Sequence, residues 1–280
     1  MTDAADFLGT PATLAEGMLD RPGCRVRYWT AGPSDGPAVV LVHGATADHR
    51  MFNAQLSLLL GRDYRVVVWD ARGHGASLPM PGTPTIDDYV ADLFALVDEL
   101  TLSRPLIVGQ SLGSYIAQHA QWHRPEGFRG LVVIGGIATS LPASRSELAV
   151  LRSTPAMLRL WPWDNFRRLA ARRAALTEPV QAYMADCLAG MDKDTFLRIW
   201  HAVVSAVSRE GFGPFPAIPV LWVHGDHDDA GAVARHARVL AERGLPNLTS
   251  YVVPDAGHNA NQDNPDAFNR ALAGFLDALD

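Results

Sequence analysis

Short apolar runs alternate with longer helical patterns along most of the chain, and this alternation limits the possible folds more than any other feature. Six continuous runs are typical of strands buried on both faces, whereas RVRYWTA alternates polar and apolar residues like an edge strand. The six runs are AVVLVHG, YRVVVWD, PLIVGQ, LVVIGG, PVLWVHG and TSYVVPD. Strands separated by helices pair in parallel and carry the helices on both faces of the sheet. The sequence therefore predicts an α/β protein built on a mostly parallel sheet.

Two segments have the pattern of helices that cover such a sheet. In residues 85–100, apolar side chains fall on one stripe, and Thr85 and Asp88 have the spacing of an N-terminal capping box. In residues 265–279, apolar side chains recur with the same helical period. Both segments are therefore predicted to be surface helices with one buried face.

Residues 138–213 interrupt the alternation, because they have a helical pattern, contain no strand-like run and are far too long for an ordinary connection. We interpret them as a helical cap inserted into a core formed by residues 1–137 and 214–280. The cap holds more large apolar side chains than short helices need for their own packing. Three of them are predicted to line a substrate pocket, with packing inside the cap as the alternative: Met157, Trp161 and Trp163.

Composition and charge limit the partners of the chain. With 280 residues, 19% charged residues and a net charge of −6, it has an ordinary globular composition and lacks the positive charge of a nucleic-acid-binding protein. Residues 1–8 carry no signal-peptide pattern, and no apolar run is long enough to span a membrane. We therefore expect a cytoplasmic protein that acts on a small-molecule substrate and has no nucleic-acid or membrane partner. A homodimer is left open.

The two cysteines, Cys24 and Cys187, lie far apart in sequence and form no CxxC pair. We expect both to be buried, and neither to form a disulfide or a thiolate metal site. The string HGDHDD lacks the ligand spacing of metallo-hydrolases. No metal site and no cofactor are therefore expected.

The segment VGQSLGS, residues 108–114, sets a serine between glycines directly after an apolar run. Because a helical run follows at once, the setting is the strand, turn and helix that a nucleophile elbow requires. Side chains at Gly109 and Gly113 would collide across so tight a turn. We predict that Ser111 is a nucleophile, and the alternative is a hydroxyl in a glycine-rich turn.

A serine hydroxyl needs a base, and the base needs an acid to orient it. Of the ten histidines, His258 alone lies in the loop after the last strand-like run, so it is the predicted base. Four others fall in helical patterns and are expected at the surface: His119, His123, His201 and His236. For the acid, the loop after PVLWVHG offers Asp226, Asp228 and Asp229, and the residues alone leave all three open.

Together these segments resemble the α/β-hydrolase fold of the capped, single-domain kind. LVHG is similar to the His-Gly segment of its oxyanion loop, WDARGHGAS to its Asp-x-Arg-Gly turn, GQSLG to its elbow, GDHD to its acid loop and AGHNANQDNPDAFN to its histidine loop. The resemblance covers nearly the whole chain and implies an eight-stranded, mostly parallel sheet with an inserted helical cap. It also implies that Asp228 is the acid, with Asp226 and Asp229 as solvated neighbours. The oxyanion is then expected to be bound by the backbone N–H groups of Ala45 and Leu112.

A serine at position 111 argues against haloalkane dehalogenases and epoxide hydrolases, which resemble this fold but have aspartate at the elbow. GQSLG also differs from the GGSWG of proline iminopeptidases, and Asn259 stands where many carbon–carbon bond hydrolases have tryptophan. The favoured function is a serine hydrolase that cleaves a carboxylic ester or lactone of a small to medium apolar substrate through an acyl-enzyme intermediate. The alternatives are a thioesterase, a carbon–carbon bond hydrolase and a non-catalytic small-molecule receptor.

Two charged groups have structural interpretations. Asp70 and Arg72 are predicted to form a local ion pair that holds the DARGHG turn. A second group is predicted to form the solvated face of one cap helix: Arg167, Arg168, Arg172 and Arg173. The alternative for this second group is binding of a phosphate-bearing acyl carrier, which keeps thioesters among the substrates considered.

Overall fold

The computed structural model describes residues 14–279 and contains one eight-stranded sheet. The strands are β1 (Ala15–Arg21), β2 (Cys24–Ala31), β3 (Ala38–Val42), β4 (Arg65–Asp70), β5 (Leu106–Gln110), β6 (Gly130–Ile134), β7 (Val220–Gly225) and β8 (Leu248–Val253). They lie in the order β1-β2-β4-β3-β5-β6-β7-β8, with parallel pairs from β4 across to β8 and antiparallel pairs on both sides of β2. The prediction of an α/β fold with a mostly parallel, eight-stranded sheet is confirmed. Residues 1–8, on which the signal-peptide argument depends, lie outside the described residues.

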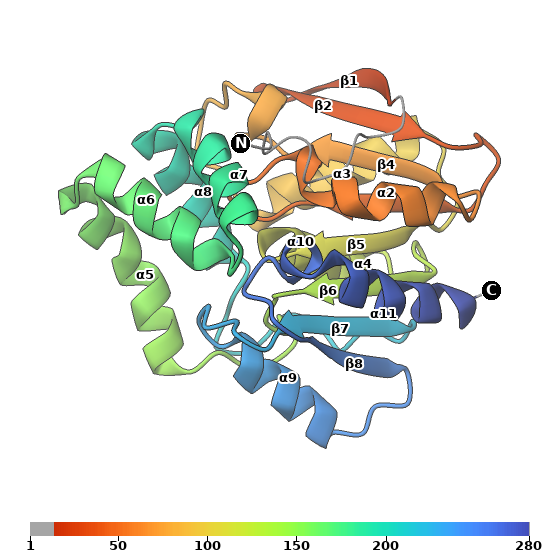
Figure 1. Ribbon diagram of the computed structural model, residues 1–280. Helices are drawn as coiled ribbons and strands as arrows, with labels where there is room; N and C mark the ends of the chain where they lie inside the picture. The colour runs from red at the N-terminus through yellow and green to blue at the C-terminus, as the bar shows by residue number, and fades with distance from the viewer. Residues whose placement is uncertain (1–13, 280) are drawn as a thin grey trace.

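Helices cover both faces of the sheet (Figure 1). One face carries α3 (Ile86–Glu99), α4 (Leu112–His123) and α9 (Val233–Glu242), and the other carries α2 (Asn53–Leu60), α10 (Ala260–Asp263) and α11 (Pro265–Asp277). Short 3-10 helices follow β3 and β4, namely η1 (His49–Phe52) and η2 (Gly75–Ser77). Along β3, Val40 and Val42 pack in one core, and Val39 and Leu41 pack in the other. Burial on both faces explains why the central strands are continuous apolar runs.

The two surface helices expected from the sequence are confirmed as α3 and α11. At the start of α3, the Thr85 N–H donates to the Asp88 carboxylate at 2.8 Å, which completes the expected capping box. In α11, Phe268 and Leu272 are fully buried in the second core. The helical period of the sequence therefore identified both the helices and their buried faces.

The edges of the sheet differ from the prediction. β1 was not expected, because AEGMLDR mixes charged residues with glycine, and its presence makes β2 an inner strand rather than an edge strand. At the opposite edge, β8 is partly exposed, although TSYVVPD has the pattern of a strand buried on both faces. The residue pattern of a strand does not show how many other strands pair with it. The sequence therefore does not reveal which strands lie at the edges of the sheet.

The expected helical insertion is confirmed, since four helices lie between β6 and β7 and form a layer at one end of the sheet (Figure 1). They are α5 (Arg145–Leu160), α6 (Trp163–Ala174), α7 (Glu178–Ala189) and α8 (Lys193–Ser205). The Asp48 N–H, after β3, donates to the Tyr183 hydroxyl of α7 at 3.1 Å, so the layer stands at the carboxyl ends of the strands. The division at residues 138–213 stays a prediction. None of the described helices is long and apolar enough to cross a membrane.

The predicted ion pair between Asp70 and Arg72 is wrong. Arg72 binds Asp92 of α3 through hydrogen bonds of 2.6 and 2.7 Å. Asp70 instead accepts bonds from the backbone N–H groups of His49 and Ala76, both at 2.7 Å. Asp70 ends a strand and binds both the turn that follows it and η1, the short helix after β3, whereas Arg72 reaches a helix on one face of the sheet. The DARGHG turn is therefore held by two separate sets of partners.

Four side chains differ in burial from the sequence-based expectation. Cys24 and Cys187 are half-buried rather than buried, and both are free thiols. His119 and His236 are buried rather than exposed. The ring of His119 hydrogen-bonds the Ala206 carbonyl at 3.2 Å, at the end of the insertion. The end of the insertion thus covers a face of α4 that would otherwise meet solvent.

Candidate active site

The turn between β5 and α4 has a strained backbone. Ser111 stands between the strand and the helix with φ of 49° and ψ of −114°, a conformation that residues with a Cβ rarely adopt. A Cβ added at Gly109 would lie 2.3 Å from the Gly113 carbonyl oxygen, and one at Gly113 would lie 2.0 Å from the Val42 carbonyl oxygen. Close approach of the backbone therefore requires both glycines, as the sequence predicts.

His258 and Asp228 come together from the loops that follow β8 and β7. Nδ1 of His258 lies 3.1 Å from Oδ2 of Asp228, whose side chain is fully buried. Burial alone would lower the pKa of His258, but the charge of Asp228 and the hydrogen bond to it outweigh burial, so the pKa is raised above its ordinary value. Because Nδ1 is engaged by the carboxylate, Nε2 of the neutral ring is the nitrogen left to accept a proton.

The backbone brings Ser111 close to this pair. The Ser111 N–H donates to the Ile134 carbonyl at 2.9 Å, and the next residue, Gly135, lies against the His258 ring. A Cβ at Gly135 would be 3.0 Å from His258 Nδ1, and its φ of +56° also favours glycine. Among the described residues, no hydrogen bond joins the Ser111 hydroxyl to His258. Such bonds are often long in free enzymes and tighten when substrate binds.

Gln110, which no sequence pattern singles out, links the elbow to the histidine loop. Its side chain is buried, and Nε2 donates to the His258 carbonyl at 3.1 Å and to Oδ1 of Asn259 at 3.2 Å. A Cβ at Gly44 would lie 1.9 Å from Oε1 of Gln110, so this side chain also borders the oxyanion loop. The signal that points to it is its place directly before Ser111, at the carboxyl end of a buried strand.

The loop after β3 carries one of the two amides expected to bind an oxyanion. The Ala71 N–H donates to Nε2 of His43 at 3.0 Å, so Nδ1 carries the proton and donates to the Gly44 carbonyl at 2.8 Å. Burial lowers the pKa of His43, which keeps the ring neutral in this arrangement. The Ala45 N–H donates to no acceptor in the described chain, and Leu112, as the first residue of α4, has no intrahelical acceptor. Both amides are therefore available to a ligand.

A pocket of about 660 Å³ lies between α5, α8 and the loop after β7. Its walls are mainly apolar and include Tyr115, Ile137, Leu151, Val203, Val207 and Ala230. Two wall residues bond directly to the predicted triad, because the Tyr115 N–H donates to the Ser111 carbonyl at 3.2 Å and the Ala230 N–H donates to Asp228 at 2.9 Å. Glu147 and Arg235 form an ion pair on its polar side. The pocket is thus lined by chain neighbours of Ser111 and Asp228, although neither of these residues nor His258 is part of its wall.

The three cap residues expected to line a pocket lie elsewhere in the insertion. Met157 and Trp161 are exposed, whereas Trp163 is half-buried. The Trp163 ring stacks on Phe166 with centroids 5.4 Å apart, and it also packs against Phe196. None of the three borders the 660 Å³ pocket. Their part in substrate binding stays a prediction.

Most of the chain matches the model of a known protein family. The model of the Alpha/beta hydrolase family matches residues 39–271, from β3 to α11. The chain belongs to this family. The match spans the elbow, the acid and histidine loops and the whole insertion.

Relatives of this hydrolase carry names of different reactions. Non-heme chloroperoxidase of Burkholderia pyrrocinia is 26% identical in an alignment that covers 93% of this chain and 99% of that protein. The 3-oxoadipate enol-lactonase 2 of Acinetobacter baylyi is 26% identical over 258 residues, which cover 90% and 92%. The solved structure of a thermophilic esterase from Thermogutta terrifontis has a TM-score of 0.75 and 22% identity, covering 96% and 99%. That last likeness shows the fold, and the reaction of this hydrolase has to be argued from its own site.

The other two aspartates of the acid loop of this hydrolase have separate partners. Asp226 accepts bonds from the N–H groups of Ala256 at 3.0 Å and Asp255 at 3.1 Å, and the bond from Ala256 chiefly lowers its pKa. Asp229 pairs with Arg173 of α6 at 2.9 Å. Asp226 thus fixes the loop that precedes His258, and Asp229 joins the acid loop to the insertion.

Other titratable groups near the site of the hydrolase are held neutral. Burial lowers the pKa of His74 to about 3, and its ring packs edge-on against His43 with centroids 4.8 Å apart. Burial also raises the pKa of the Cys187 thiol, next to Asp48. Within residues 14–279, no three His, Cys, Asp or Glu side chains are grouped so that they could hold a metal ion. Among the described histidines whose pKa is shifted, His258 is the one whose pKa is raised.

Proposed function

We propose that this hydrolase cleaves a carboxylic ester or lactone of a small to medium, largely apolar substrate. Ser111 is the nucleophile, His258 the general base and Asp228 the group that orients it. The observation that carries the proposal is the 3.1 Å contact between His258 Nδ1 and the buried Asp228 carboxylate, beside the strained turn that presents Ser111. A hydroxyl next to a base held in one tautomer is what nucleophilic acyl transfer requires.

In the acylation step, the Ser111 Oγ attacks the carbonyl carbon of the substrate while its proton passes to Nε2 of His258. Asp228 stabilises the imidazolium that forms. The carbonyl oxygen becomes an oxyanion, which accepts hydrogen bonds from the N–H groups of Ala45 and Leu112. Each donor of this kind lowers the barrier by about 3 kcal/mol.

The tetrahedral intermediate then collapses to the acyl-enzyme. The imidazolium of His258 gives its proton to the leaving alkoxide, so the alcohol departs neutral. Water replaces the alcohol, transfers a proton to the same nitrogen and attacks the acyl carbon. The second tetrahedral intermediate then collapses: the bond between the acyl carbon and Ser111 Oγ breaks, His258 returns its proton to that oxygen, and the acid leaves. A lactone follows the same path, except that its alcohol stays attached to the released acid.

The substrate class rests on the pocket and on the relatives. The pocket of about 660 Å³ is within the range of small-molecule sites, which is about 300 to 1,000 Å³. Its mainly apolar walls suit an apolar substituent, and the pair of Glu147 and Arg235 offers polar groups at one side. Among the relatives, one is named an enol-lactonase, which supports a lactone or ester as the substrate.

A fluorophosphonate probe tests the proposal, because it labels an activated serine and leaves other hydroxyls intact. We expect labelling of the wild-type protein and none of Ser111→Ala. A panel of p-nitrophenyl esters of increasing chain length, run beside lactones and thioesters, then ranks the substrates. A thioesterase or carbon–carbon bond hydrolase would label but leave esters and lactones uncleaved. Absence of labelling in folded protein would favour the non-catalytic receptor.

A further inference from the structure

The end of α6 and most of α7 contact three loops around the proposed active site, namely the acid loop, the histidine loop and the oxyanion loop. Figure 1 shows α7 on the side of the insertion that is nearer the sheet, with α5 on the outer side. Arg173 pairs with Asp229 in the acid loop. The Ala174 carbonyl accepts a 2.9 Å bond from the Asn259 N–H in the histidine loop. Tyr183 contacts the oxyanion loop. Residues 173–187 are called the inner segment below.

Asp263 joins the inner segment to the histidine loop. Its side chain is buried, with 8% of the residue exposed, and its carboxylate accepts four hydrogen bonds. Oδ2 accepts from the N–H groups of Leu176 at 2.8 Å and Gly257 at 2.9 Å, and Oδ1 accepts from the N–H and hydroxyl of Thr177 at 2.9 and 2.8 Å. One side chain therefore holds the start of α7 and the residue before His258.

The backbone of His258 is fixed on both sides by these contacts. The preceding N–H, of Gly257, is bound by Asp263, and the following N–H, of Asn259, is bound by the Ala174 carbonyl. The His258 carbonyl accepts from Gln110 at 3.1 Å. When the peptide groups on both sides of a residue are fixed, they set the direction of its side chain. The insertion thus helps to aim the imidazole at Asp228 and Ser111.

Tyr183 joins the inner segment to the oxyanion loop. Only 3% of the residue is exposed, and its hydroxyl accepts from the Asp48 N–H at 3.1 Å and lies 3.2 Å from the Asp48 carbonyl oxygen. Arg50 adds a second link, because it binds the Asp48 carboxylate at 2.7 Å and Asp186 of α7 at 2.9 Å. Asp48 lies three residues after Ala45, whose amide is a proposed oxyanion donor.

The oxyanion loop has a reason to need such an anchor. Thr46 has a φ of +68°, in the left-handed region that a residue with a branched Cβ avoids. A conformation of this kind costs about 1 to 3 kcal/mol and persists where surrounding contacts over-determine it. The bonds from Tyr183 to Asp48 begin two residues after Thr46, so they hold the strained turn in place.

We propose that Asp263 and Tyr183 are positioning residues, through which the insertion sets the geometry of the histidine loop and of the oxyanion loop. The inference rests on the proposed function. Each side chain acts through the backbone of the loop that it binds, so neither contacts the reacting atoms. The inner segment then holds the histidine loop and the oxyanion loop in the positions that the reaction requires. A displacement of about 1 Å at either loop can slow the reaction about a hundredfold.

The histidine loop is tested with Asp263→Asn, which keeps the shape but replaces one acceptor oxygen by an NH₂ group facing N–H donors. We expect the pKa of His258, followed by NMR titration of ¹⁵N-labelled imidazole, to fall by about half a unit or more because contact with Asp228 weakens. This measurement needs no turnover, so it stays informative if the proposed hydrolase activity fails. Thr177→Val removes only the hydroxyl that donates to Asp263, and it replaces Asp263→Asn in this test if that variant does not fold.

The oxyanion loop is tested with Tyr183→Phe, which removes the hydroxyl and keeps the ring. We expect kcat on a p-nitrophenyl ester to fall about tenfold with KM within about twofold, because the lost contact acts on the transition state. The rate of fluorophosphonate labelling should fall in parallel, while the pKa of His258 is unchanged. The two variants thus have different signatures, which a general loss of stability does not produce.

Matched controls separate positioning from folding. Asp192→Asn removes the carboxylate that caps α8, 2.6 Å from the Thr195 N–H, and Tyr89→Phe removes a buried hydroxyl that donates to the Arg72 carbonyl at 3.1 Å. Tyr89→Phe should lose stability, Asp192→Asn should change stability little because asparagine caps a helix as well as aspartate does, and both controls should keep the His258 pKa and kcat. If Asp263→Asn and Tyr183→Phe behave like them, the inference is overturned. If the wild-type protein neither labels nor cleaves any ester, the proposed function fails, and the NMR titration still decides the role of Asp263.

Discussion

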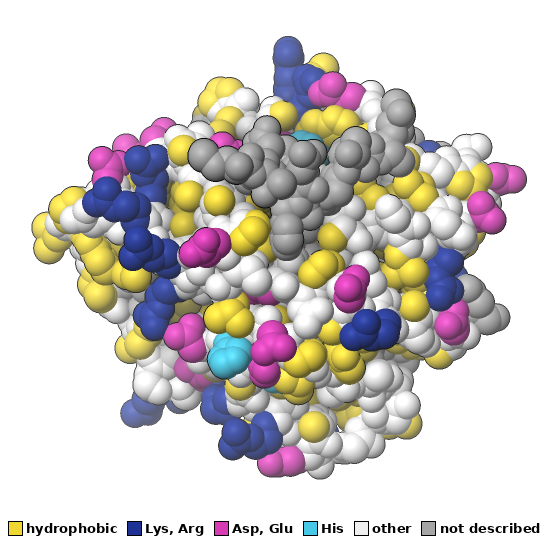
Figure 2. All heavy atoms as spheres, viewed as in Figure 1, with side chains coloured by type: hydrophobic (Ala, Val, Ile, Leu, Met, Phe, Trp, Pro, Cys, Tyr) yellow, Lys and Arg dark blue, Asp and Glu magenta, His cyan; other side chains and the backbone are white. Residues whose placement is uncertain are grey.

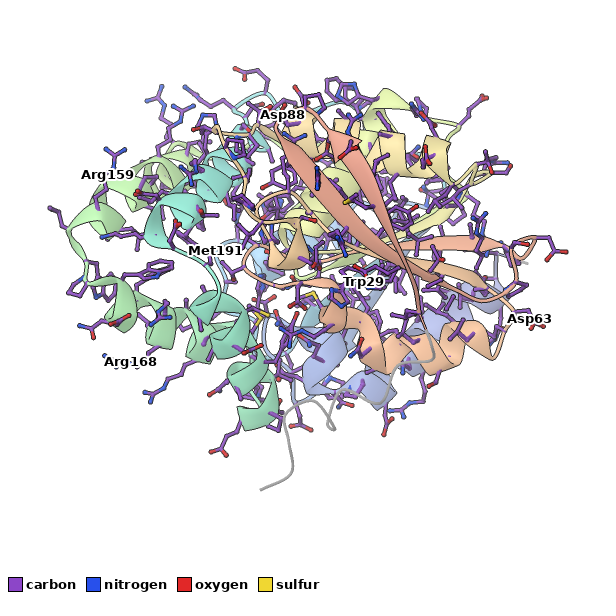
Figure 3. The ribbon with its side chains drawn as sticks, turned by 90° about the horizontal axis from the view of Figure 1, so that it is seen from above. Trp29, Asp63, Asp88, Arg159, Arg168 and Met191 are labelled. Atoms are coloured by element: carbon purple, nitrogen blue, oxygen red, sulfur yellow. The ribbon has the colours of Figure 1, made fainter. Side chains whose placement is uncertain are left out.

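The inner and outer parts of the insertion are held in different ways. The inner segment is bound to core loops by backbone hydrogen bonds and by buried side chains, whereas α5 and the turn that follows it expose apolar groups, with 90% of Leu160 and 60% of Met157 exposed. Figure 2 shows hydrophobic side chains at the outer edge, beside a row of Lys and Arg side chains. In Figure 3, Arg159 and Arg168 lie at the outer end, and Met191 lies nearer the sheet.

One inserted segment can therefore serve two purposes. The inner segment contacts the backbone on both sides of His258, so its geometry and that of the reacting groups depend on each other. The outer part contributes Leu151 to the wall of the 660 Å³ pocket, from α5. Changes in the outer part are thus expected to alter the choice of substrate, and changes in the inner segment are expected to alter the rate of the chemical step.

The largest effect is expected where the loops bound by the inner segment meet. Ser111→Ala and His258→Ala should each lower kcat by about 10⁴- to 10⁶-fold, because they remove the nucleophile or the base. Thermal unfolding should change little, since neither side chain fills the core. Steady-state kinetics and calorimetry on the same samples check both points. A residual rate within about a hundredfold of wild type would mean that the inner segment holds loops of no catalytic importance.

The next effect concerns the acid. Asp228→Asn should lower kcat by about 10³- to 10⁴-fold, since an amide no longer fixes the tautomer of His258. The charge of Asp228 also raises the pKa of His258 against the effect of burial, so its removal should shift the acid limb of kcat/KM to lower pH. Asp229→Asn is the control, because Asp229 is exposed and a weaker influence on the same pKa. An equal shift in both variants would contradict the assignment of the acid.

Local patterns were enough to predict the central strands of the sheet and the tight turn at Ser111. Continuous apolar runs identify strands that are buried on both faces, and the two glycines around Ser111 reflect a backbone approach that the structure contains. The choice of Asp228 among three aspartates came from the family resemblance, and in the structure this is the aspartate that contacts His258. The strands and the turn are each encoded by neighbouring residues, so a single sequence reveals them.

The contacts that tie the insertion to the core could not be predicted in this way. Asp263 binds Leu176 across 87 residues of sequence, and Asp48 binds Tyr183 across 135. Neither pair has a spacing or period that marks it, because each partner is an ordinary residue of its own loop or helix. The same reason explains the wrong ion pair of Arg72, which found its partner on α3 rather than two residues away.

An ion pair near the inner segment has a more buried carboxylate than one on the outer surface of the insertion. Asp48→Ala removes a buried carboxylate that accepts from Arg50 of η1, which also binds Asp186 of the inner segment, and we expect a loss of about 2 kcal/mol in the free energy of unfolding. Burial raises the pKa of Asp48, but the hydrogen bonds and charge of Arg50 outweigh burial, so the folded pKa is lowered. The contribution is thus present above the unfolded pKa of about 3.9 and is lost as pH falls through the folded value. Urea unfolding at neutral and acid pH measures both.

The control for this prediction is the exposed pair of Asp164 and Arg167 on α6, whose nearest atoms are 2.6 Å apart. Asp164→Ala should change the free energy of unfolding by no more than about 0.5 kcal/mol, because water and salt screen an exposed pair. Equal losses of unfolding free energy in Asp48→Ala and Asp164→Ala would mean that the two ion pairs stabilise the protein equally. That result would remove the electrostatic part of the comparison.

The smallest effect is expected at Leu160, at the end of α5. Leu160→Ser should change the free energy of unfolding by less than about 0.5 kcal/mol, because a side chain that is 90% exposed loses almost no burial. Phe196→Ala, in the same insertion, should cost about 3 kcal/mol, because that ring is buried and packs on Phe166 with centroids 5.0 Å apart. The two variants together separate the outer surface from the aromatic cluster beneath it. A loss above about 1 kcal/mol in the free energy of unfolding of Leu160→Ser would mean that the turn after α5 packs against another surface in solution. The inner segment and the outer part would then both be buried, the first against the core of the same chain and the second against a partner.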